Sequence, residues 1–429
     1  MNRESLSTFL RQSGGLTAAI FLGGLASYAV HKFAKEMPKA DYGVFTTLLQ
    51  LLNLVGIPVI GIQTTLAQQT AAAQTAGDRR QLAAALRTVL LGILVIWIAT
   101  AAIVLVFQNQ LLETLKISSP GTLWITMACA LMALWLPVFS GVLQGRQDFL
   151  RLGGSIFSLS VVRLISIAVI VGFSAYVTSV MVGVWLGYFA ALALVWWAAR
   201  DALRNAGDEP FLWRPWVKRL VPFKFGAGAG ILLMCADMIL VQHYFKAEQT
   251  GFYAAAGMIG RALVFLVGPI VMVMFPKVAR ATATGEKSNV LFQTLGLTAL
   301  IAGGAAGFCT LFPELPLRLV YDPSFLPIAA PLVPWFAWAM TPLVLAGVLN
   351  SHLLARGRYA VVPWLMIVAI SYLVVLSVVA KRSSTLEPLT GFIRVVQTLG
   401  LFNLLFLVVA LFFSWRERES TQSSAANSV

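Results

Sequence analysis

Twelve apolar runs recur along the chain and limit what it can fold into more than any other feature. Most are about 18–25 residues long, and two are longer, which as a helix is enough to cross the roughly 30 Å hydrocarbon core of a bilayer. The sequence therefore predicts an all-α integral membrane protein with twelve transmembrane helices. The runs lie near 13–31, 42–66, 86–107, 121–143, 153–174, 177–199, 220–243, 251–275, 289–312, 325–354, 359–380 and 388–414.

Composition supports this class and argues against a nucleic-acid partner. Of the 429 residues, 59% are hydrophobic and only 11% are charged, whereas a soluble domain has about 25% charged residues. The net charge of +14 comes from Lys and Arg scattered through short loops. Most of them fall on the side of the N-terminus, so the positive-inside rule predicts that both termini are cytoplasmic.

Prolines interrupt two of the runs. Pro58 lies within the second run, and Pro331, Pro334 and Pro342 lie within the tenth. Because proline removes a helical hydrogen bond, we expect kinks or tilt at these positions.

Short motifs recur at a nearly constant spacing and predict an internal duplication. Gly43 and Gly251 each follow an outer turn and are 208 residues apart, and Gly77-Asp78-Arg79 and Gly285-Glu286-Lys287 repeat the same offset. Gly141-Val142-Leu143-Gln144 recurs 206 residues later as Gly347-Val348-Leu349-Asn350. Since each half has six helices, the second half re-enters the membrane from the same side. The halves are therefore expected to be parallel repeats related by an axis along the membrane normal.

These features divide the chain into four predicted segments. Residues 1–199 and 220–414 form an N-terminal and a C-terminal six-helix bundle. Residues 200–219 form a cytoplasmic linker in which Trp213 and Trp216 stand among basic residues, typical of an interfacial segment or of a plain tether with interfacial anchors. Residues 415–429 form a polar cytoplasmic tail that we expect to be disordered.

Three arginines lie within the predicted spans. Arg163 and Arg261 are deep, and Arg394 is near the outer end of the last span. A charge at bilayer depth costs about 2.5–3.5 kcal/mol on insertion scales, so such residues usually pair or face an aqueous cavity. A cavity lined by arginines suits a phosphate or diphosphate, which the guanidinium binds through paired donors. For Arg394, the alternative is simple snorkelling to the interface.

Asp237 and the polar face of the second span are the remaining candidates. Asp237 lies about as far from the intervening turn as Arg261 does, at ~1.5 Å per residue, so the two could form an ion pair that is either structural or used in transport. Gln50 and Asn53 lie on a polar stripe of the second span. Such groups suit a sugar-bearing substrate, although polar contacts between helices are an equal alternative.

We find no sign of catalysis, of a metal site or of a cofactor site. The sequence contains no phosphate-binding glycine loop, no HExxH and no nucleophile motif. Cys129, Cys235 and Cys309 lie inside apolar runs without metal-ligand spacing, as expected of small packing residues. Three histidines lie near the ends of spans, where we expect them at the interface: His31, His243 and His352.

Several motifs resemble a known family. DYGVF (41–45), LQGRQDF (143–149), Asp237 in the seventh span, TGFYAAA (250–256) and FPKVAR (275–280) resemble those of the polysaccharide and oligosaccharide (O-antigen type) flippases. This family belongs to the MOP (multidrug/oligosaccharidyl-lipid/polysaccharide) superfamily. The resemblance covers nearly the whole chain but specifies the superfamily better than the substrate.

The resemblance implies a transporter of the bacterial cytoplasmic (inner) membrane rather than an enzyme. Its expected substrate is a polyprenyl-diphosphate-linked oligosaccharide, moved across the lipid bilayer by alternating access during cell-surface polysaccharide and lipopolysaccharide biosynthesis. A polysaccharide polymerase or a glycosyltransferase is an expected partner on the same ground. Basic cavity residues would contact the diphosphate, which points to Arg163, Arg261 and Arg394.

Two alternatives remain open. A cation-coupled multidrug exporter of the same superfamily would need acidic cavity residues, and the N-terminal half has no Asp or Glu inside its spans. An integral membrane glycan polymerase or ligase would need a sizeable outer loop for its catalytic groups, and the outer turns here are short.

Overall fold

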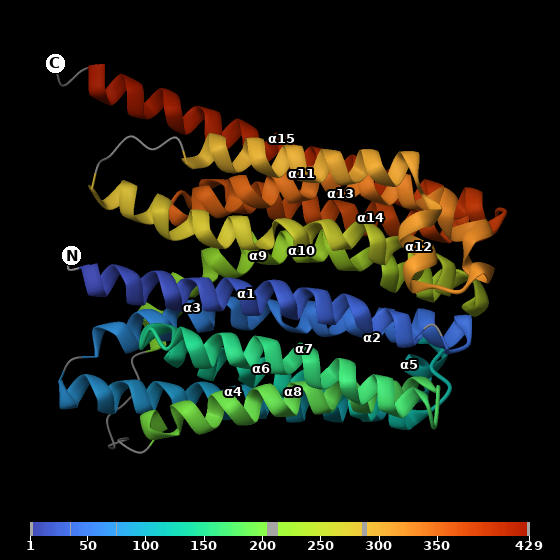
Figure 1. Cartoon of the computed structure of the whole chain (residues 1–429), viewed down its shortest axis with the longest axis horizontal. Coiled ribbons are helices and arrows are strands. Elements are labelled where there is room, and N and C mark those ends of the chain that lie inside the picture. The colour runs from blue at the N-terminus through green and yellow to red at the C-terminus, as the bar shows by residue number, and fades with distance from the viewer. Residues whose placement is uncertain (1–2, 35, 74, 204–212, 285–289, 427–429) are drawn as a thin grey trace. The chain divides into compact units, whose positions relative to one another are not determined.

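The computed structural model describes the chain outside residues 1–2, 35, 74, 204–212, 285–289 and 427–429. It divides into two compact units, Met1–Lys224 and Phe225–Val429. Every extended element within the described residues is helical, and no strand occurs among them. Figure 1 shows the helices of each unit lying side by side along one direction.

The helices follow the chain in simple order, with short 3-10 turns between some of them. The N-terminal unit contains α1 (Arg3–Ala34), α2 (Lys39–Val55), α3 (Ile57–Ala72), α4 (Ala76–Val106), α5 (Gln108–Leu115), α6 (Pro120–Gly145), α7 (Phe149–Val171), α8 (Val177–Ala199) and η1 (Arg200–Leu203). The C-terminal unit contains most of α9 (Trp213–Tyr244), then α10 (Ala247–Thr284), α11 (Val290–Leu311), α12 (Glu314–Val320), η2 (Pro323–Phe325), α13 (Leu326–Ala355), η3 (Tyr359–Val361), α14 (Val362–Ser383) and α15 (Pro388–Ala426).

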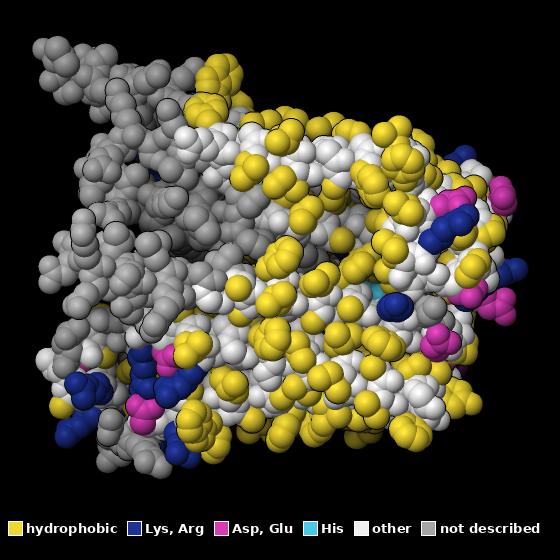
Figure 2. Space-filling model, viewed as in Figure 1, with side chains coloured by type: hydrophobic (Ala, Val, Ile, Leu, Met, Phe, Trp, Pro, Cys, Tyr) yellow, Lys and Arg dark blue, Asp and Glu magenta, His cyan; other side chains and the backbone are white. Residues whose placement is uncertain are grey.

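Ten candidate membrane spans, by length and composition, are found among the described residues. The two other predicted runs, 13–31 and 251–275, fall within α1 and α10, both of which include side chains outside the described set. Figure 2 shows hydrophobic side chains along the flanks of the described helices and charged side chains gathered at their ends. An all-helical membrane protein is thus confirmed.

Polar caps and prolines fix several helix ends. Thr75 and Asp78 form a capping box at the start of α4, where each side chain satisfies the other's backbone amide. Ser119 caps α6 just before Pro120, and Asp148 caps α7. These polar residues mark the boundaries that the apolar runs alone leave imprecise.

Proline has different effects in the two interrupted runs. The second predicted span is broken at Gly56, two residues before Pro58, so that α2 and α3 are separate helices. In contrast, α13 continues as one helix through Pro331, Pro334 and Pro342. The interruption expected in the second run is present, because proline there supplies no amide hydrogen to a turn that also contains glycine.

The helices next to the predicted linker and tail begin and end at other residues than expected. Helix α9 begins at Trp213 rather than near residue 220, so Trp213 and Trp216 belong to a helix. Residues 204–212 of the linker lie outside the described residues. Helix α15 continues to Ala426 across most of the tail expected to be disordered. The tail begins with the run Arg416-Glu417-Arg418-Glu419, and because Arg and Glu are good helix formers they can extend a helix that is already nucleated.

Glycines bring helices of the N-terminal unit into backbone contact. A Cβ at Gly141 would lie 2.6 Å from the carbonyl oxygen of Gln63, and one at Gly145 would meet the carbonyl of Ala67, both on α3. On α8, a Cβ at Gly187 would lie 2.6 Å from the Leu159 carbonyl oxygen of α7. Small residues spaced by four at such crossings let membrane helices approach closely.

We expect Gly141→Ala to lower the free energy of unfolding of the detergent-solubilised protein by about 1–3 kcal/mol. The added methyl group would overlap the backbone of α3, which cannot rotate away as a side chain can. Gly92→Ala on α4 is the matched control, since its Cβ would meet nothing within 4 Å. A thermal-unfolding midpoint of Gly141→Ala equal to that of Gly92→Ala would contradict the close packing of α6 on α3.

Candidate functional site

Arg163 lies well inside α7, fourteen residues after its start and eight before its end. At ~1.5 Å per residue this is near the middle of the span. The side chain is half-buried, and its Nε is buried with no hydrogen-bond partner among the described residues. No carboxylate of the described residues lies within ion-pair distance of it. It is therefore an arginine at membrane depth whose charge the described protein leaves uncompensated.

The surroundings of Arg163 come from four other helices of the same unit. Its guanidinium interacts electrostatically with Tyr188 of α8, Cys129 of α6 and His31 of α1. The Nδ1 of His31 is hydrogen-bonded to the hydroxyl of Tyr42 on α2, at 2.9 Å. This group of residues, which we call the Arg163 cluster, combines the guanidinium with two tyrosine hydroxyls, one imidazole and one thiol.

Gly187 helps to set the position of Arg163. A Cβ on Gly187 would lie 2.8 Å from the Cβ of Arg163, so α8 passes directly over the root of the arginine side chain. On the α1 side, the hydroxyl of Ser27 donates to Ser160, one turn before Arg163, at 3.0 Å. The two contacts hold the α7 backbone on both sides of the cluster.

The predicted polar stripe on the second span is present on α2. Gln50 is buried, whereas Asn53 is exposed and donates from Nδ2 to the Oε1 of Gln50 at 3.1 Å. Thr46, one turn earlier, is also buried and bonds to backbone carbonyls of its own helix. The structure therefore brings Gln50 and Asn53 together, with the exposed Asn53 amide available to a ligand.

The C-terminal unit joins Asp237 of α9 to Arg261 of α10. The Nη2 of Arg261 donates to both carboxylate oxygens, at 2.7 and 2.6 Å, and its Nε donates to the carbonyl of Met234 at 2.9 Å. The hydroxyl of Tyr253 donates a third hydrogen bond to Asp237, at 2.8 Å. Both charged side chains are buried, at 0% exposure for Asp237 and 3% for Arg261.

Aromatic rings close this ion pair on the α13 side. The guanidinium carbon of Arg261 lies 5.7 Å from the ring centroid of Phe336, which itself packs on Tyr253 with centroids 4.9 Å apart. Every charge of the pair is thus met by a protein group. In this arrangement the pair is neutral as a whole, and Arg261 can reach an external anion only if its bonds to Asp237 are given up.

Arg394 differs from Arg163 and from the Asp237–Arg261 pair because its side chain is exposed. It is exposed two turns into α15, so its position fits either snorkelling or a place at the mouth of a pathway. Among the described residues, no three His, Cys, Asp or Glu side chains form a group that could hold a metal ion.

His31 and Tyr42 are the residues that sequence reasoning missed. His31 was expected at the interface, because it stands at the end of the first apolar run, but it is buried at 2% exposure. Its partner lies eleven residues further on, across the turn between α1 and α2. A buried histidine beside an arginine is unusual enough to mark a functional candidate.

We expect Asp237→Asn to lower the free energy of unfolding by about 3–5 kcal/mol, because it leaves Arg261 as a buried, uncompensated charge. The double variant Asp237→Leu with Arg261→Met should recover most of that loss. Glu314→Gln breaks the exposed pair with Arg318 and should change stability by no more than about 1 kcal/mol. Thermal unfolding in detergent distinguishes these outcomes, and equal midpoints for Asp237→Asn and Glu314→Gln would contradict a stabilising buried pair.

No family model matches this sequence, and no curated protein matches it significantly. Solved structures do. An inward-facing multidrug resistance MATE family transporter of the MOP superfamily aligns with a TM-score of 0.72 and 14% identity, over 94% of this chain and 96% of that one. The lipid II flippase MurJ in an inward closed conformation aligns with a TM-score of 0.71 and 11% identity, over 94% and 87%.

A MOP superfamily transporter from Pyrococcus furiosus, described as having a binding pocket of reverse polarity that suggests a different function, aligns with a TM-score of 0.67 and 15% identity. That alignment covers 95% of each chain. At such low identities the likeness is one of fold. The chain has the fold of the MOP superfamily transporters along nearly its whole length.

Proposed function

We propose that this protein is a flippase that moves a polyprenyl-diphosphate-linked oligosaccharide across the membrane. The observation that carries the proposal is Arg163, a cation at membrane depth without a carboxylate partner among the described residues. Holding an uncompensated charge there is costly unless a ligand or water completes it. A diphosphate is the ligand whose charge and geometry best match a guanidinium.

The balance of charge in the described interior favours an anionic over a cationic substrate. Asp237 is the only buried carboxylate among the described residues, and Arg261 already neutralises it. Arg163 has no such counterpart within the same part of the chain. A site for an organic cation would need the opposite arrangement, with an acidic group left free.

Hydrogen-bonding groups near the cation suit the glycan portion of such a substrate. The Asn53 amide is exposed on α2, and Tyr42, Tyr188 and His31 belong to the Arg163 cluster. Sugar hydroxyls both donate and accept, so amide, hydroxyl and imidazole groups can bind them without a fixed pattern. The lipid chain would remain in the bilayer while the polar part crosses.

We further propose twelve spans arranged as two parallel six-helix repeats. The order of helices supports this, since a short helix follows the third span of each half, α5 in one and α12 in the other. Helix pairs inside the units also correspond: α3–α6, α4–α6, α6–α8 and α7–α8 match α10–α13, α11–α13, α13–α15 and α14–α15. Parallel repeats of this kind are the architecture of alternating-access transporters.

In this proposal the remaining charged residues have secondary parts. Arg394 would attract the diphosphate near an outer opening. The Asp237–Arg261 pair is either a fixed brace or a switch that opens during the cycle and offers Arg261 to the substrate. The membrane is the bacterial cytoplasmic membrane with both termini in the cytoplasm, and a polysaccharide polymerase or glycosyltransferase would act beside the transporter.

A cation-coupled multidrug exporter is the second candidate, and its specific support is the structural likeness to a MATE transporter, as close as that to MurJ. The two functions place opposite demands on the interior. If the protein exports cations, Asp237 should be essential for transport and Arg163 dispensable. If it is a flippase, substitution of Arg163 should impair transport more than substitution of Asp237.

Reconstitution into liposomes that contain a fluorescent polyprenyl-diphosphate oligosaccharide tests the proposal directly. We expect the wild-type protein to accelerate the exchange of the probe between leaflets, and Arg163→Gln to reduce the rate at least tenfold while inserting normally. Arg163→Lys should retain part of the activity, because it keeps the charge but loses the paired donors. Arg318→Gln, in an exposed pair on α12, is the matched control and should behave as wild type.

Two further probes separate the alternatives. Lipid II in place of the oligosaccharide would show whether the cargo is the peptidoglycan precursor, and an organic cation with a proton or sodium gradient would reveal an exporter. Normal probe exchange by Arg163→Gln would overturn the assignment of Arg163. No exchange by the wild-type protein, together with gradient-driven efflux of the cation, would overturn the flippase proposal.

A further inference from the structure

An apolar groove lies on the N-terminal unit, between α4, α6 and α8. Its volume is about 570 Å³, within the range of roughly 300–1,000 Å³ typical of small-molecule sites. Its walls carry Leu91 and Leu94 of α4, Trp135 of α6, and Phe189 and Trp196 of α8, and Leu203 of η1 stands at one end. The groove is separate from the Arg163 cluster, so a ligand bound in it is independent of the proposed function.

The groove is open to the side on which lipid would lie. Leu91, Phe189 and Trp196 line it with 61%, 50% and 48% of their surface exposed. The indole nitrogen of Trp135 is directed to the Leu90 carbonyl, so this polar group of the wall is already bonded. Such a surface has nothing to offer a polar ligand and suits a hydrocarbon chain.

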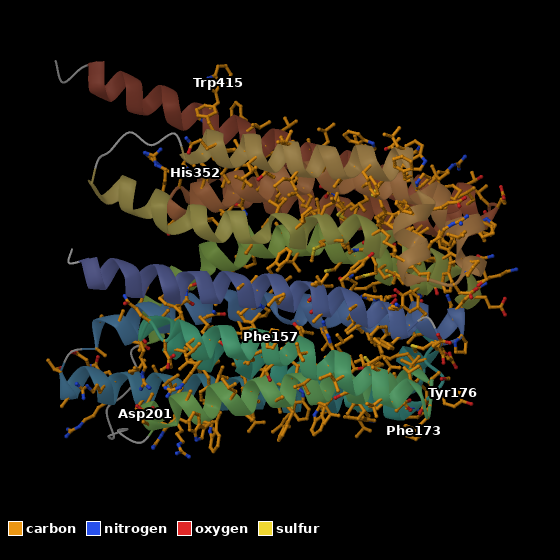
Figure 3. All side chains as sticks on the ribbon, viewed as in Figure 1. Phe157, Phe173, Tyr176, Asp201, His352 and Trp415 are labelled. Carbon is orange, nitrogen blue, oxygen red and sulfur yellow. The ribbon has the colours of Figure 1, made fainter. Side chains whose placement is uncertain are left out.

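Basic residues surround one end of the groove. Arg87 of α4 donates from Nη2 to the carbonyl oxygen of Leu203 at 2.9 Å, which places its guanidinium against a residue of the groove. Arg200 lies over the ring of Trp197 at 5.9 Å, next to the lining residue Trp196. Figure 2 shows the dark blue side chains gathered at this end of the unit, where Figure 3 labels Asp201.

The acidic groups at this end are already engaged. Asp201 receives two hydrogen bonds from Arg146, at 2.9 and 2.8 Å, and Asp148 is paired with Arg151 at 2.9 Å. Within the described residues, neither Arg87 nor Arg200 has a carboxylate within 4 Å. The end of the groove therefore presents the Arg87 guanidinium to a negatively charged headgroup, and Arg200, whose guanidinium lies on Trp197, stands three residues before the lining residue Leu203.

We propose that this groove is a binding site for an anionic phospholipid, with one acyl chain in the groove and the phosphate at Arg87. The length of the groove favours a phospholipid over a longer polyprenyl chain. The lining residues of α8 run from Phe189 to Trp196, seven residues or ~10 Å of helix, which is within the half of the ~30 Å hydrocarbon core that one leaflet supplies. Basic pockets between membrane helices are suited to anionic headgroups.

Native mass spectrometry of the full-length protein, with phosphatidylglycerol and phosphatidylcholine of identical chains in equal amounts, tests the site. We expect phosphatidylglycerol to be retained about fivefold over phosphatidylcholine for each cation that contacts the phosphate. Arg87→Gln should reduce that preference about fivefold, because glutamine keeps a donor for Leu203 but no charge. Arg318→Gln, the same change on α12, should leave it unaltered.

Filling the groove tests the chain-binding part. Ala193→Trp, with Leu91→Trp as a second variant, should reduce retention of both lipids at least fivefold, whereas Val169→Trp adds the same ring to an exposed position of α7 outside the groove and should not. Equal retention of the two lipids by the wild type, or full retention by both groove variants, would overturn the proposal. Displacement of the lipid by a polyprenyl phosphate alone would also overturn it, since the groove would then hold the tail of a polyprenyl lipid.

Discussion

Backbone contact at glycine is the constraint on which the N-terminal unit depends. In a bilayer, an apolar side chain gains nothing by exchanging lipid for protein, so helix association relies on close van der Waals packing and polar contacts. Gly141 and Gly145 bring α6 onto the backbone of α3, and Gly183 and Gly187 bring α8 onto α7. The second of these crossings also seats Arg163. In the C-terminal unit, Gly260 lies against Phe336 in the same way, immediately before Arg261 of the buried ion pair.

The helices were largely predictable from the sequence, and their ends were not. Every predicted apolar run matches a helix to within a few residues at its ends, or two helices where Gly56 divides the second run. Hydrophobic length is a strong signal, because a span must cover the hydrocarbon core. It says little about where a helix stops outside the membrane. The start of α9 at Trp213 and the continuation of α15 to Ala426 depend on helix propensity in polar segments, which was not visible as an apolar run.

Contacts within the candidate site were predictable only for two residues on helices joined by one short connection. Asp237 and Arg261 are at matched distances from the α9–α10 connection, so their pairing could be foreseen as one of two options, and the structure shows the pair formed. Whether it opens during transport stays a prediction. Arg163 has no carboxylate partner among the described residues because α1, α6 and α8 place other side chains around it. This packing could not be predicted from the sequence near Arg163. The burial of His31 was equally unpredictable, because it results from packing against Tyr42 and Phe45 rather than from the local sequence.

The uncompensated charge of Arg163 also bears on how the protein is made. While the fifth span enters the membrane, none of its later neighbours is present, so the full cost of roughly 2.5–3.5 kcal/mol for a central arginine falls on that segment alone. The apolar residues that make up most of Phe149–Val171 offset this cost. Replacing the arginine with leucine would ease insertion and raise yield. Under the proposed function, selection for expression level and selection for transport therefore act on this position in opposite directions.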